Sequence, residues 1–407
     1  MSAENAARVA VIGAGAAGIA AARSLRDHGH RASITVFGEE SLPPYDRPQL
    51  SKEVLSGPAD TVPRVLLSEQ ECRDLGIDLR AGTRIDALDR TEVFQLRTEG
   101  VLLAEAEVVV LATGLRSRHL ATQAEGLHHL RSWLDAASLR SALARRAGRL
   151  LVVGSGFVGM EVAAAAMSRG WQVVAVEARS RLFPGLGPRI GDHVAAMFAE
   201  RGLDGRPATT VTSVEGAGPY LVQLSDGSQV EADEILVGVG GVPNDALARQ
   251  VGAAIGDGVL VDAAFRTSVP GLYAIGDVAS CPGRWGRTRH EHWRTAQEHG
   301  SHCGAVIAGA EIPFDHLPWV WSDVFDHRIE ILGSPRAARS SHTLRSNEGG
   351  LVDLHLGQEG ELLGVTTFDA TRFARKARAA TRRAARVDLE RAAVSGQTAE
   401  AVLEAIG

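Results

Sequence analysis

The chain has 407 residues, of which 45% are hydrophobic and 23% are charged, and its formal net charge is −6. This length is too great for one hydrophobic core and predicts two to three domains of an ordinary globular protein. The negative charge excludes a general attraction to nucleic acid or anionic membranes, and no apolar run reaches the roughly 18 residues of a membrane span.

The first predicted unit begins at Val9–Gly18, where a β-branched strand is followed by G-x-G-x-x-G and an Ala-rich stretch. In this pattern Gly13 allows a tight turn, Gly15 lets the backbone approach a pyrophosphate, and Gly18 lets the helix pack on its strand. The diphosphate then lies at the helix N-terminus, where free N–H groups and the helix dipole favour anions. A lone fingerprint is weak, and a glycine-rich turn is the alternative.

The stretch Ser33–Phe37 is predicted to be the second strand of this unit, and it is followed by Gly38 and Glu39. Glu39 follows the last fingerprint glycine by about 20 residues, the spacing of a carboxylate that accepts a hydrogen bond from a ribose hydroxyl.

The next segment, Leu42–Lys52, contains three prolines and is predicted to be an ordered loop that leads into a helix, with Ser51 as a possible cap. Lys52 and Lys376 are the only lysines in a chain that otherwise uses arginine for its cations. Because lysine is a compact point charge with a movable pKa, Lys52 is a candidate functional residue. An exposed surface lysine is the alternative.

Strands are predicted next at Ile77–Leu79 and Thr83–Leu88, followed by a hairpin of Thr91–Leu96 with Val101–Leu103. Glu107–Leu111 has the apolar pattern of a buried parallel strand and leads into Ala112-Thr113-Gly114.

A second fingerprint follows a predicted helix at about Ser132–Arg146. Gly154, Gly156 and Gly159 occupy the three glycine positions, and Glu177 ends the predicted strand Gln172–Val176. Glu177 has the same spacing of about 20 residues from its loop. Two fingerprints, each with its acid, predict two dinucleotide sites. Glu161, in the first turn of the second helix, is either functional or a partner for the helix dipole.

The rest of the chain is predicted to contain a helix at Ile190–Arg201, strands between Thr209 and Val230, and a buried strand at Glu234–Val239. A strand that ends in Gly276-Asp277 places a carboxylate at the C-terminal edge of a sheet, where α/β proteins bind ligands. The remaining predicted elements are a helix and three strands: His290–Gly309, Ile329–Leu332, Val352–Leu356 and Leu362–Phe368.

The stretch Thr371–Leu389 has the period of an amphipathic helix. Its cations share one face and its apolar residues share another. The cationic face is Arg372, Arg375, Lys376, Arg382, Arg383 and Arg386, and the apolar face is Phe373, Ala377, Ala380, Ala384 and Val387. A second cluster is Arg284, Arg287 and Arg289. Each is either a docking face for an acidic partner or a solvated charge face.

The three cysteines, Cys72, Cys281 and Cys303, are scattered without C-x-x-C. This argues against a disulfide framework, a metal cluster or a redox-active dithiol, and it favours a reducing cytoplasm.

The chain resembles the NADH-dependent, FAD-containing ferredoxin reductases of oxygenase systems, the putidaredoxin reductase and biphenyl dioxygenase reductase type. The resemblance spans about residues 8 to 335. The matching blocks are GAGAAG at 13–18, PYDRPQLSK at 44–52, LATG at 111–114, VGSGFVGME at 153–161, GVGGVPN at 238–244, RTSVPGLYAIGD at 266–277, RHEHWRTAQEHG at 289–300 and PWVWSD at 318–323.

The resemblance implies an α/β fold with two Rossmann-like domains for FAD and NAD and a C-terminal α+β domain. The implied segments are an FAD domain at 1–112 and 237–317, an NAD domain at 113–236 and an interface domain at 318–407. It also implies an oxidoreductase that takes a hydride from NADH onto FAD and passes single electrons to an acidic 2Fe-2S ferredoxin, which serves a cytochrome P450 or a Rieske-type dioxygenase.

The resemblance also implies which residues contact the cofactors. FAD contacts fall on Gly13, Gly15, Ala17, Glu39, Arg47, Lys52, Ile85, Arg131, Asp277 and Trp293. NADH contacts fall on Gly154, Gly156, Val158, Gly159, Glu161, Glu177, Gly240 and Gly241. Further cofactor contacts are Ala16, Gly18, Ala112, Thr113, Gly114, Gly276 and Trp321. Lys52 and Glu161 are the implied catalytic pair, and no metal is implied.

Two departures from the family pattern are Gly185, where many relatives have Arg, and Thr295, where Asn is usual. Glu177 favours NADH because a carboxylate repels the 2′-phosphate of NADPH, although Arg179 and Arg181 lie nearby in the sequence. Alternative functions of the same fold are an NADH oxidase, a quinone or monodehydroascorbate reductase, and a redox-regulated interaction protein. A disulfide or peroxide reductase is disfavoured because the loop at 42–52 has no cysteine.

Overall fold

The structure is a computed structural model that describes residues 7–58, 60–122, 124–387 and 398–404. The chain divides into two compact units. The first comprises residues 1–48, 62–116 and 242–316, and the second comprises 49–61, 117–241 and 317–407. Within the described residues, no helix is long and apolar enough to cross a membrane.

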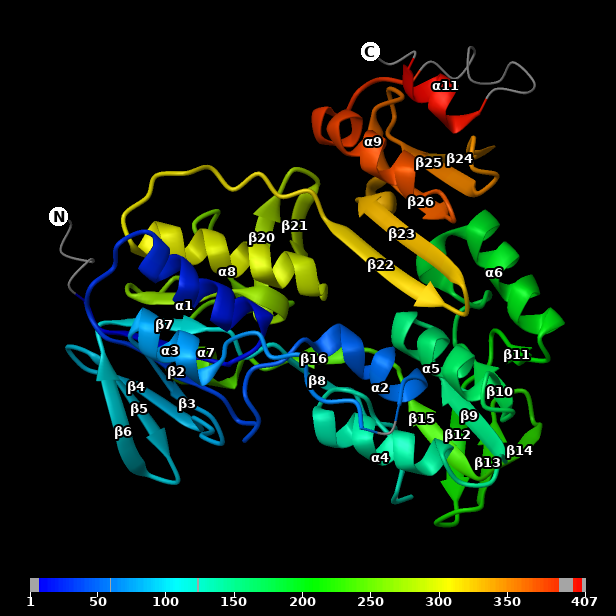
Figure 1. Cartoon of the computed structure of the whole chain (residues 1–407), viewed down its shortest axis with the longest axis horizontal. Coiled ribbons are helices and arrows are strands. Elements are labelled where there is room, and N and C mark those ends of the chain that lie inside the picture. Colours follow the sequence, from blue (N-terminus) through cyan, green and yellow to red (C-terminus); the bar gives the residue numbers. More distant parts are fainter. Residues whose placement is uncertain (1–6, 59, 123, 388–397, 405–407) are drawn as a thin grey trace. The chain divides into compact units, whose positions relative to one another are not determined.

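The first unit is built on a five-stranded parallel sheet whose order is β19-β7-β1-β2-β3. Figure 1 labels β7, β2 and β3 of this sheet. Its strands are short, and the interior ones are apolar because helices cover a parallel sheet on both faces, whereas the edge strand β3 is partly exposed. Their bounds are Leu272–Ala274, Val108–Leu111, Val9–Ile12, Ile34–Phe37 and Ile77–Arg80 in that order. The helices of this unit are α1 (Ala16–Asp27), α3 (Glu69–Leu75), α7 (Ala246–Gln250) and α8 (Trp293–Ile307).

Two smaller sheets complete the first unit. One is the antiparallel sheet of β4 (Ala87–Arg90), β5 (Phe94–Thr98) and β6 (Val101–Ala106). The other contains β17 (Ile255–Gly256), β18 (Gly258–Leu260), β20 (Ala279–Gly283) and β21 (Gly286–Arg289). The predicted strand at Thr83–Leu88 was wrong: the strand begins at Ala87, and Ile85 instead buries its side chain in the core from a loop.

The second unit contains a four-stranded parallel sheet of order β11-β10-β9-β15. These strands are Asp204–Arg206, Gln172–Val176, Arg149–Val153 and Glu234–Val237. Its helices are α2 (Glu53–Ser56), α4 (Trp133–Leu143), α5 (Phe157–Met167) and α6 (Pro188–Glu200). An antiparallel sheet follows, formed by β12 (Val211–Glu215), β13 (Tyr220–Leu224) and β14 (Gln229–Ala232). The short strands β8 (Leu115–Ser117) and β16 (Gly241–Pro243) pair with each other where the chain passes from one unit to the other.

The C-terminal part of the second unit is an antiparallel sheet of order β22-β23-β26-β25-β24 with α9 packed on β23 and β26. Its elements are β22 (Trp319–Val324), β23 (His327–Gly333), β24 (Ser340–Arg345), β25 (Leu351–Leu356), β26 (Leu362–Phe368), α9 (Thr371–Arg383) and α11 (Ala399–Glu404).

Both parallel sheets place the strand before the glycine loop in the interior and the next strand beside it, the order of a Rossmann-like fold. Together with the C-terminal α+β part, this arrangement confirms the predicted fold class.

The amphipathic helix predicted at Thr371–Leu389 is shorter than expected. It ends at Arg383, and Ala384 adopts a left-handed conformation with φ 49°. The N–H groups of Ala384 and Ala385 close the end on the carbonyls of Thr381 and Ala380. Arg386 then pairs with Glu361 in an isolated antiparallel bridge, so it is not on the helix. Residues 388 and 389 lie outside the described residues.

Candidate cofactor and electron-transfer site

The first glycine loop requires glycine at its turn and at its helix contact. Gly13 has φ +116°, and a Cβ there would lie 2.1 Å from the carbonyl oxygen of Ala112. A Cβ on Gly18 would lie 1.9 Å from the carbonyl oxygen of Gly13. Gly15, by contrast, faces open space with no atom within 4 Å of an added Cβ. The geometry therefore fits a backbone that folds tightly at two glycines and leaves the third free for a ligand.

The second glycine loop repeats this geometry in its own unit. Gly154 has φ +95°, and its Cβ would lie 2.5 Å from the carbonyl oxygen of Gly238. A Cβ on Gly159 would lie 2.2 Å from the carbonyl oxygen of Gly154, and Gly156 faces open space. Both loops are therefore shaped to bring a backbone against a diphosphate.

The helices that follow the two loops have no side-chain cap. The N-cap residues of α1 and α5 are Gly15 and Gly156, and neither helix has an acidic residue in its first turn. The predicted position of Glu161 in the first turn of the second helix was therefore wrong, because α5 begins at Phe157 and Glu161 lies beyond that turn. In contrast, α3 and α4 each carry a complete capping box, from Ser68 and Ser132 respectively. Since the first N–H groups of a helix need acceptors, α1 and α5 have N–H groups available for an external anion. The residues present therefore fit FAD and NADH.

Helix α8 packs along α1 through small residues, and the two helices are parallel (Figure 1). A Cβ on Gly300 would lie 2.1 Å from the carbonyl oxygen of Ala17, and one on Gly304 would lie 2.5 Å from that of Ala21. Because α8 begins at Trp293, its N-terminus extends about 10 Å beyond that of α1. The N-termini of α1 and α8 therefore point in the same direction, and that of α8 is displaced along the helix axis. The N–H groups of α8 can thus reach a different part of a ligand whose diphosphate lies at the start of α1.

The turn at Gly276–Val278 follows β19 at the carboxyl end of the first parallel sheet. Gly276 has φ +69°, and an added Cβ would lie 2.9 Å from the Cβ of Ala17. The predicted FAD residues Gly276 and Ala17 are therefore in close contact, and the turn places Asp277 at the ligand edge of the sheet.

Glu177 lies directly after β10 and is oriented by the second glycine loop. Its Oε2 accepts hydrogen bonds from the N–H of Ser155 at 3.0 Å and from the Ser155 hydroxyl at 2.8 Å. Its Oε1 accepts the N–H of Arg179 at 3.0 Å. The Ser155 hydroxyl in turn accepts the N–H of Phe183 at 3.0 Å, which folds the following segment against the loop. The structure thus holds the carboxylate beside this loop, and its contact with the ribose of NADH stays a prediction.

Glu39 is the second residue after β2, whereas Glu177 is the first residue after β10. Gly13 and Gly154 each donate to the last residue of the neighbouring strand, Phe37 and Val176 respectively. Gly38, not Glu39, therefore occupies the place of Glu177. Glu39 instead pairs with Arg84 at 3.3 Å, and both side chains are 70% exposed.

The carboxylate of Glu40 holds the loop that follows it through two hydrogen bonds. Glu40 accepts the hydroxyl of Tyr45 at 2.6 Å and the guanidinium of Arg47 at 2.8 Å. This holds Arg47, a predicted FAD contact, within an ordered loop.

Glu161 is a buried carboxylate that joins three segments of the second unit. It is 7% exposed on α5 and forms an ion pair with Lys52, whose side chain is 17% exposed. It also accepts the hydroxyls of Ser51 and Ser322, the latter at 2.6 Å. The predicted Lys52–Glu161 ion pair is therefore present, and its place beside the flavin stays a prediction. Ser51 does not cap α2, whose N-cap is Lys52 without a side-chain hydrogen bond.

Ser322 was missed by the sequence analysis. It is fully buried on β22 and lies within the PWVWSD block. The sequence analysis took only Trp321 from this block, and the only sequence signal for the serine was its place in a polar pair after the tryptophans.

The two tryptophans of β22 stack on each other. The ring centroids of Trp319 and Trp321 are 5.0 Å apart, and the Arg378 guanidinium of α9 lies 5.4 Å from the Trp319 ring. The indole N–H of Trp319 donates to Glu330 at 3.1 Å. Trp321, a predicted cofactor contact, thus belongs to a stack that is continued by α9.

The Ala112-Thr113-Gly114 turn is tied to the segment at Asn244. The Thr113 hydroxyl donates to the Asn244 carbonyl at 2.7 Å, and the Asn244 side-chain amide donates to the Thr113 carbonyl at 3.0 Å. Asn244 lies in the GVPN block but was not predicted as a site residue.

The remaining predicted contacts occupy ordinary positions in their elements. Ile85 is buried in the first unit, Arg131 donates its N–H to Asp135 before α4, and Val158 is partly exposed in the first turn of α5. Gly240 has φ +90° at the loop before β16, which begins at Gly241. Ala16 is the first residue of α1.

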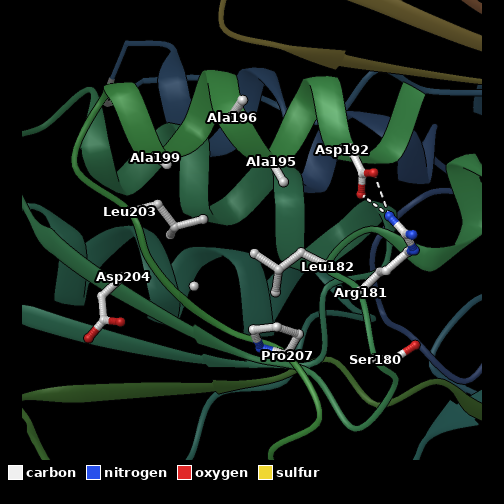
Figure 2. Close-up of a pocket in the computed structure, with 11 residues that line it drawn as sticks. Ser180, Arg181, Leu182, Asp192, Ala195, Ala196, Ala199, Leu203, Asp204 and Pro207 are labelled. Carbon is white, nitrogen blue, oxygen red and sulfur yellow. Dashed lines mark hydrogen bonds and ion pairs between the residues drawn. The ribbon is translucent and has the colours of Figure 1, made fainter. Parts of the chain in front are cut away.

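A surface pocket of about 780 Å³ lies beside the segment after Glu177 (Figure 2). It is lined by Ser180–Leu182, by alanines of α6, and by residues at β11, and it includes none of the predicted cofactor contacts. Figure 2 shows Arg181 directed at Asp192, with which it forms an ion pair. Arg181 is therefore paired within the protein, although it is near Glu177 in sequence.

The three cysteines are free and buried. Burial raises the pKa of Cys281 to about 11 and that of Cys303 further. Since the thiolate is the reactive form, these thiols are unsuited to disulfide chemistry. The described residues contain no cluster of His, Cys, Asp or Glu that could hold a metal.

The two predicted cationic clusters differ in the structure. On α9, the exposed cations are Arg372, Arg375, Lys376, Arg382 and Arg383, of which Arg372 forms an ion pair with Glu348. The opposite face buries Phe373, Ala377 and Ala380. In the second cluster, Arg289 has only 9% of its side chain exposed and pairs with Asp257 and Glu291, so its charge is neutralised within the protein. Arg287 is exposed, but its guanidinium donates to the carbonyls of Val261 and Ser280.

Comparison with known proteins identifies two families in the chain. The family described as pyridine nucleotide-disulphide oxidoreductase matches residues 7–300, and the family described as reductase C-terminal matches residues 319–399. The bounds of the four predicted domain segments stay a prediction.

The chain is similar to ferredoxin reductases over nearly its whole length. It is 33% identical to the ferredoxin–NAD(+) reductase component of the p-cumate 2,3-dioxygenase system of Pseudomonas putida, over 96% of this chain and 97% of that one. It is 35% identical to the reductase component of the biphenyl dioxygenase system of Paraburkholderia xenovorans, over 80% of each chain. Its structure matches the crystal structure of the covalent putidaredoxin reductase–putidaredoxin complex with a TM-score of 0.89 and 25% identity, over 98% of each chain.

These matches confirm the predicted resemblance, the predicted oxidoreductase class and the predicted cofactors, FAD and NADH. The helices without side-chain caps after the two glycine loops and the oriented carboxylate of Glu177 agree with FAD and NADH as cofactors. The chain belongs to the pyridine nucleotide-disulphide oxidoreductase family, with a reductase C-terminal domain, and is a relative of the ferredoxin–NAD(+) reductases of oxygenase systems.

Proposed function

We propose that the chain takes a hydride from NADH onto FAD and passes single electrons to an acidic 2Fe-2S ferredoxin, which serves a cytochrome P450 or a Rieske-type oxygenase. The observation that carries the proposal is the pair of uncapped glycine loops, of which only the second has a fixed carboxylate. We also propose a cytoplasmic location, on the basis of the three unpaired cysteines.

FAD supplies the conversion between a two-electron donor and a one-electron acceptor, and the protein supplies binding and orientation. The N–H groups at the start of α1 bind the FAD diphosphate, and those at the start of α5 bind the NADH diphosphate. Glu177 accepts hydrogen bonds from the ribose hydroxyls of NADH and repels a 2′-phosphate.

Each unit has one further feature with a proposed role in positioning the reacting rings. The N-terminus of α8 directs N–H groups toward the negative charge that FAD gains on reduction. The Lys52–Glu161 pair keeps a cation in place within a largely buried environment, and the hydroxyls of Ser51 and Ser322 satisfy the remaining carboxylate lone pairs.

We further propose that the exposed cations of α9 attract the ferredoxin. They form a concentrated positive surface on a chain whose net charge is −6. Such a surface accelerates the encounter with an acidic partner, and the acceleration weakens as salt screens the charges. Arg289 is not part of this surface because its charge is neutralised by Asp257 and Glu291.

The proposal is tested by NADH-driven cytochrome c reduction with and without an added acidic 2Fe-2S ferredoxin. We expect reduction to depend on the ferredoxin. Ferredoxin-independent turnover with oxygen or a quinone would instead identify an oxidase or a small-molecule reductase.

The docking surface is tested by reversing Arg382 and Arg383 to Glu. We expect the apparent Michaelis constant for ferredoxin to rise and its salt dependence to flatten, while ferricyanide reduction stays nearly unchanged. A matched control reverses Arg73 and Arg80, which are exposed in the first unit. If both double variants affect ferredoxin turnover equally, net charge is responsible and α9 is not the docking surface.

A further inference from the structure

His299 is a fully buried histidine to which no cofactor motif assigns a role. It lies on α8 with its ring centroid 4.6 Å from that of Phe265 and 5.4 Å from that of Phe314. Burial, aided by nearby His316, His290 and His302, lowers its pKa well below the ordinary value. The ring is therefore neutral at pH 7, with one nitrogen as a donor and the other as an acceptor.

The hydrogen bonds of the ring determine which nitrogen carries the proton. The backbone N–H of Gly276 lies 3.3 Å from Nδ1 and is a donor only, so Nδ1 is the acceptor. The proton is therefore on Nε2, which faces the sulfur of Cys281 at 3.8 Å. The Cys281 thiol lies 3.8 Å from the Thr288 carbonyl and donates to it, which leaves its sulfur free to accept from Nε2.

The turn that His299 contacts has little space to move. Gly276 has φ +69°, and an added Cβ would lie 2.9 Å from the Cβ of Ala17 and 3.6 Å from that of Ala296. The buried N–H of Gly276 therefore needs an acceptor within the protein, and His299 provides it.

We propose that His299 is a positioning residue of the FAD site: its neutral ring holds the Gly276 N–H and thereby fixes Asp277 and the start of α1 relative to each other. The proposal rests on the proposed binding of FAD at the first glycine loop. It predicts that an acceptor at the position of Nδ1 is needed for firm FAD binding, whereas the aromatic ring itself is not.

The test compares three variants in the FAD-loaded protein. His299→Leu removes the acceptor, and His299→Asn keeps one near the place of Nδ1. His302→Leu is the matched control, because His302 lies one turn further along α8 and packs on the same Phe265 and Phe314 rings. The described hydrogen bonds give His302 no contact with the Gly276–Val278 turn.

The readout is the rate of FAD release in a chaotropic salt, followed by the rise in flavin fluorescence. We expect His299→Leu to release FAD faster by on the order of tenfold, with His299→Asn and His302→Leu close to wild type. Equal acceleration in His299→Leu and His302→Leu would show that only ring packing matters and would overturn the proposal. Absence of FAD from the wild-type protein would instead refute the proposed function.

A measurement without variants keeps the proposal testable if His299→Leu does not fold. Nitrogen NMR of histidine-labelled wild-type holoenzyme reports which ring nitrogen is protonated. We expect the Nε2–H form of His299 to persist between pH 6 and 8. A protonated Nδ1 would overturn the proposal, because it cannot accept the Gly276 N–H.

Discussion

The two glycine loops share their backbone and differ at one pair of side chains. In the second loop, Ser155 holds the carboxylate of Glu177 with its N–H and its hydroxyl. In the first loop the corresponding residues are Ala14 and Gly38, and a Cβ on Gly38 would lie 2.9 Å from that of Ala14. The first loop therefore has neither the carboxylate nor the hydroxyl that would orient it.

This difference separates two kinds of binding. Under the proposed function, the second loop carries its own selectivity for a nucleotide without a 2′-phosphate, as an exchanging cosubstrate requires. The first loop leaves recognition to the segments around it, which are the Gly276–Val278 turn, the N-terminus of α8 and the loop fastened by Glu40. Many contacts of this kind suit a cofactor that stays bound.

The largest effect is expected from an alanine at the open glycine of each loop. Gly15 and Gly156 face open space, so Gly15→Ala and Gly156→Ala should fold but block the approach of a diphosphate. We expect Gly15→Ala to lose FAD and Gly156→Ala to keep FAD and lose NADH, each by about 1,000-fold, equivalent to about 4 kcal/mol. Flavin absorbance and NADH titration measure the two losses, and loss of FAD from Gly156→Ala would invert the assignment.

A smaller effect is expected from breaking the ion pair of the second unit. Lys52→Ala leaves the carboxylate of Glu161 without its cation, which costs up to about 3–5 kcal/mol for a fully buried pair. Because the Lys52 side chain is 17% exposed, we expect a smaller loss, about 100-fold in the rate of flavin reduction by NADH. Stopped-flow absorbance measures the rate. Lys376→Ala, on the exposed face of α9, is the control. Equal rates of flavin reduction in the two variants would show that Lys52 has no more effect on this step than an exposed lysine.

A further test addresses the carboxylate that distinguishes the loops. Glu177→Ala removes the repulsion of a 2′-phosphate, and Ser155→Ala leaves the carboxylate in place but removes the hydroxyl that orients it. We expect the preference for NADH over NADPH to fall by about tenfold in Glu177→Ala and by less in Ser155→Ala. The ratio of kcat/KM for the two nucleotides measures the preference. Glu39→Ala, in the first unit, should leave that ratio unchanged.

The smallest effect concerns the response of the second unit to acid. His355 lies between the hydroxyls of Ser341 and Thr366, and burial lowers its pKa to about 4. The unfolded chain binds a proton here near pH 6.5 and the folded chain does not, so stability falls as the pH drops below that value.

We therefore expect the free energy of unfolding to fall by about 1 kcal/mol more between pH 6.5 and 5.5 in the wild type than in His355→Gln. Denaturant unfolding at the two pH values measures this difference. Equal pH dependence in both proteins would show that His355 is protonated in the folded state.

The elements that form the cofactor site were the most predictable part of the fold. The fingerprints determine strand, turn and helix within a few residues because tight turns and close helix contacts admit only glycine, as at Gly13 and Gly154. The strand Gln172–Val176 and the ion pair of Lys52 with Glu161 were both predicted. Lys52 was a candidate because the chain otherwise uses arginine for its cations, and the resemblance supplied Glu161 as its partner.

What the sequence could not provide were contacts between distant segments. The hydroxyl of Ser322 reaches Glu161, and Asn244 closes the turn at Thr113, although no local periodicity marks either residue. The end of α9 was also missed, because Ala384 is a good helix former by propensity and its left-handed conformation is imposed by the following segment. The neutralisation of Arg289 likewise depends on Asp257, which is distant in sequence.

The division of labour between the two loops is tested most directly by anaerobic stopped-flow reduction of the purified yellow protein with NADH and with NADPH. The flavin absorbance should bleach much faster with NADH, because Glu177 is fixed beside the second loop by Ser155 and Arg179. Equal specificity constants for the two nucleotides would contradict the assignment of NADH selection to Glu177.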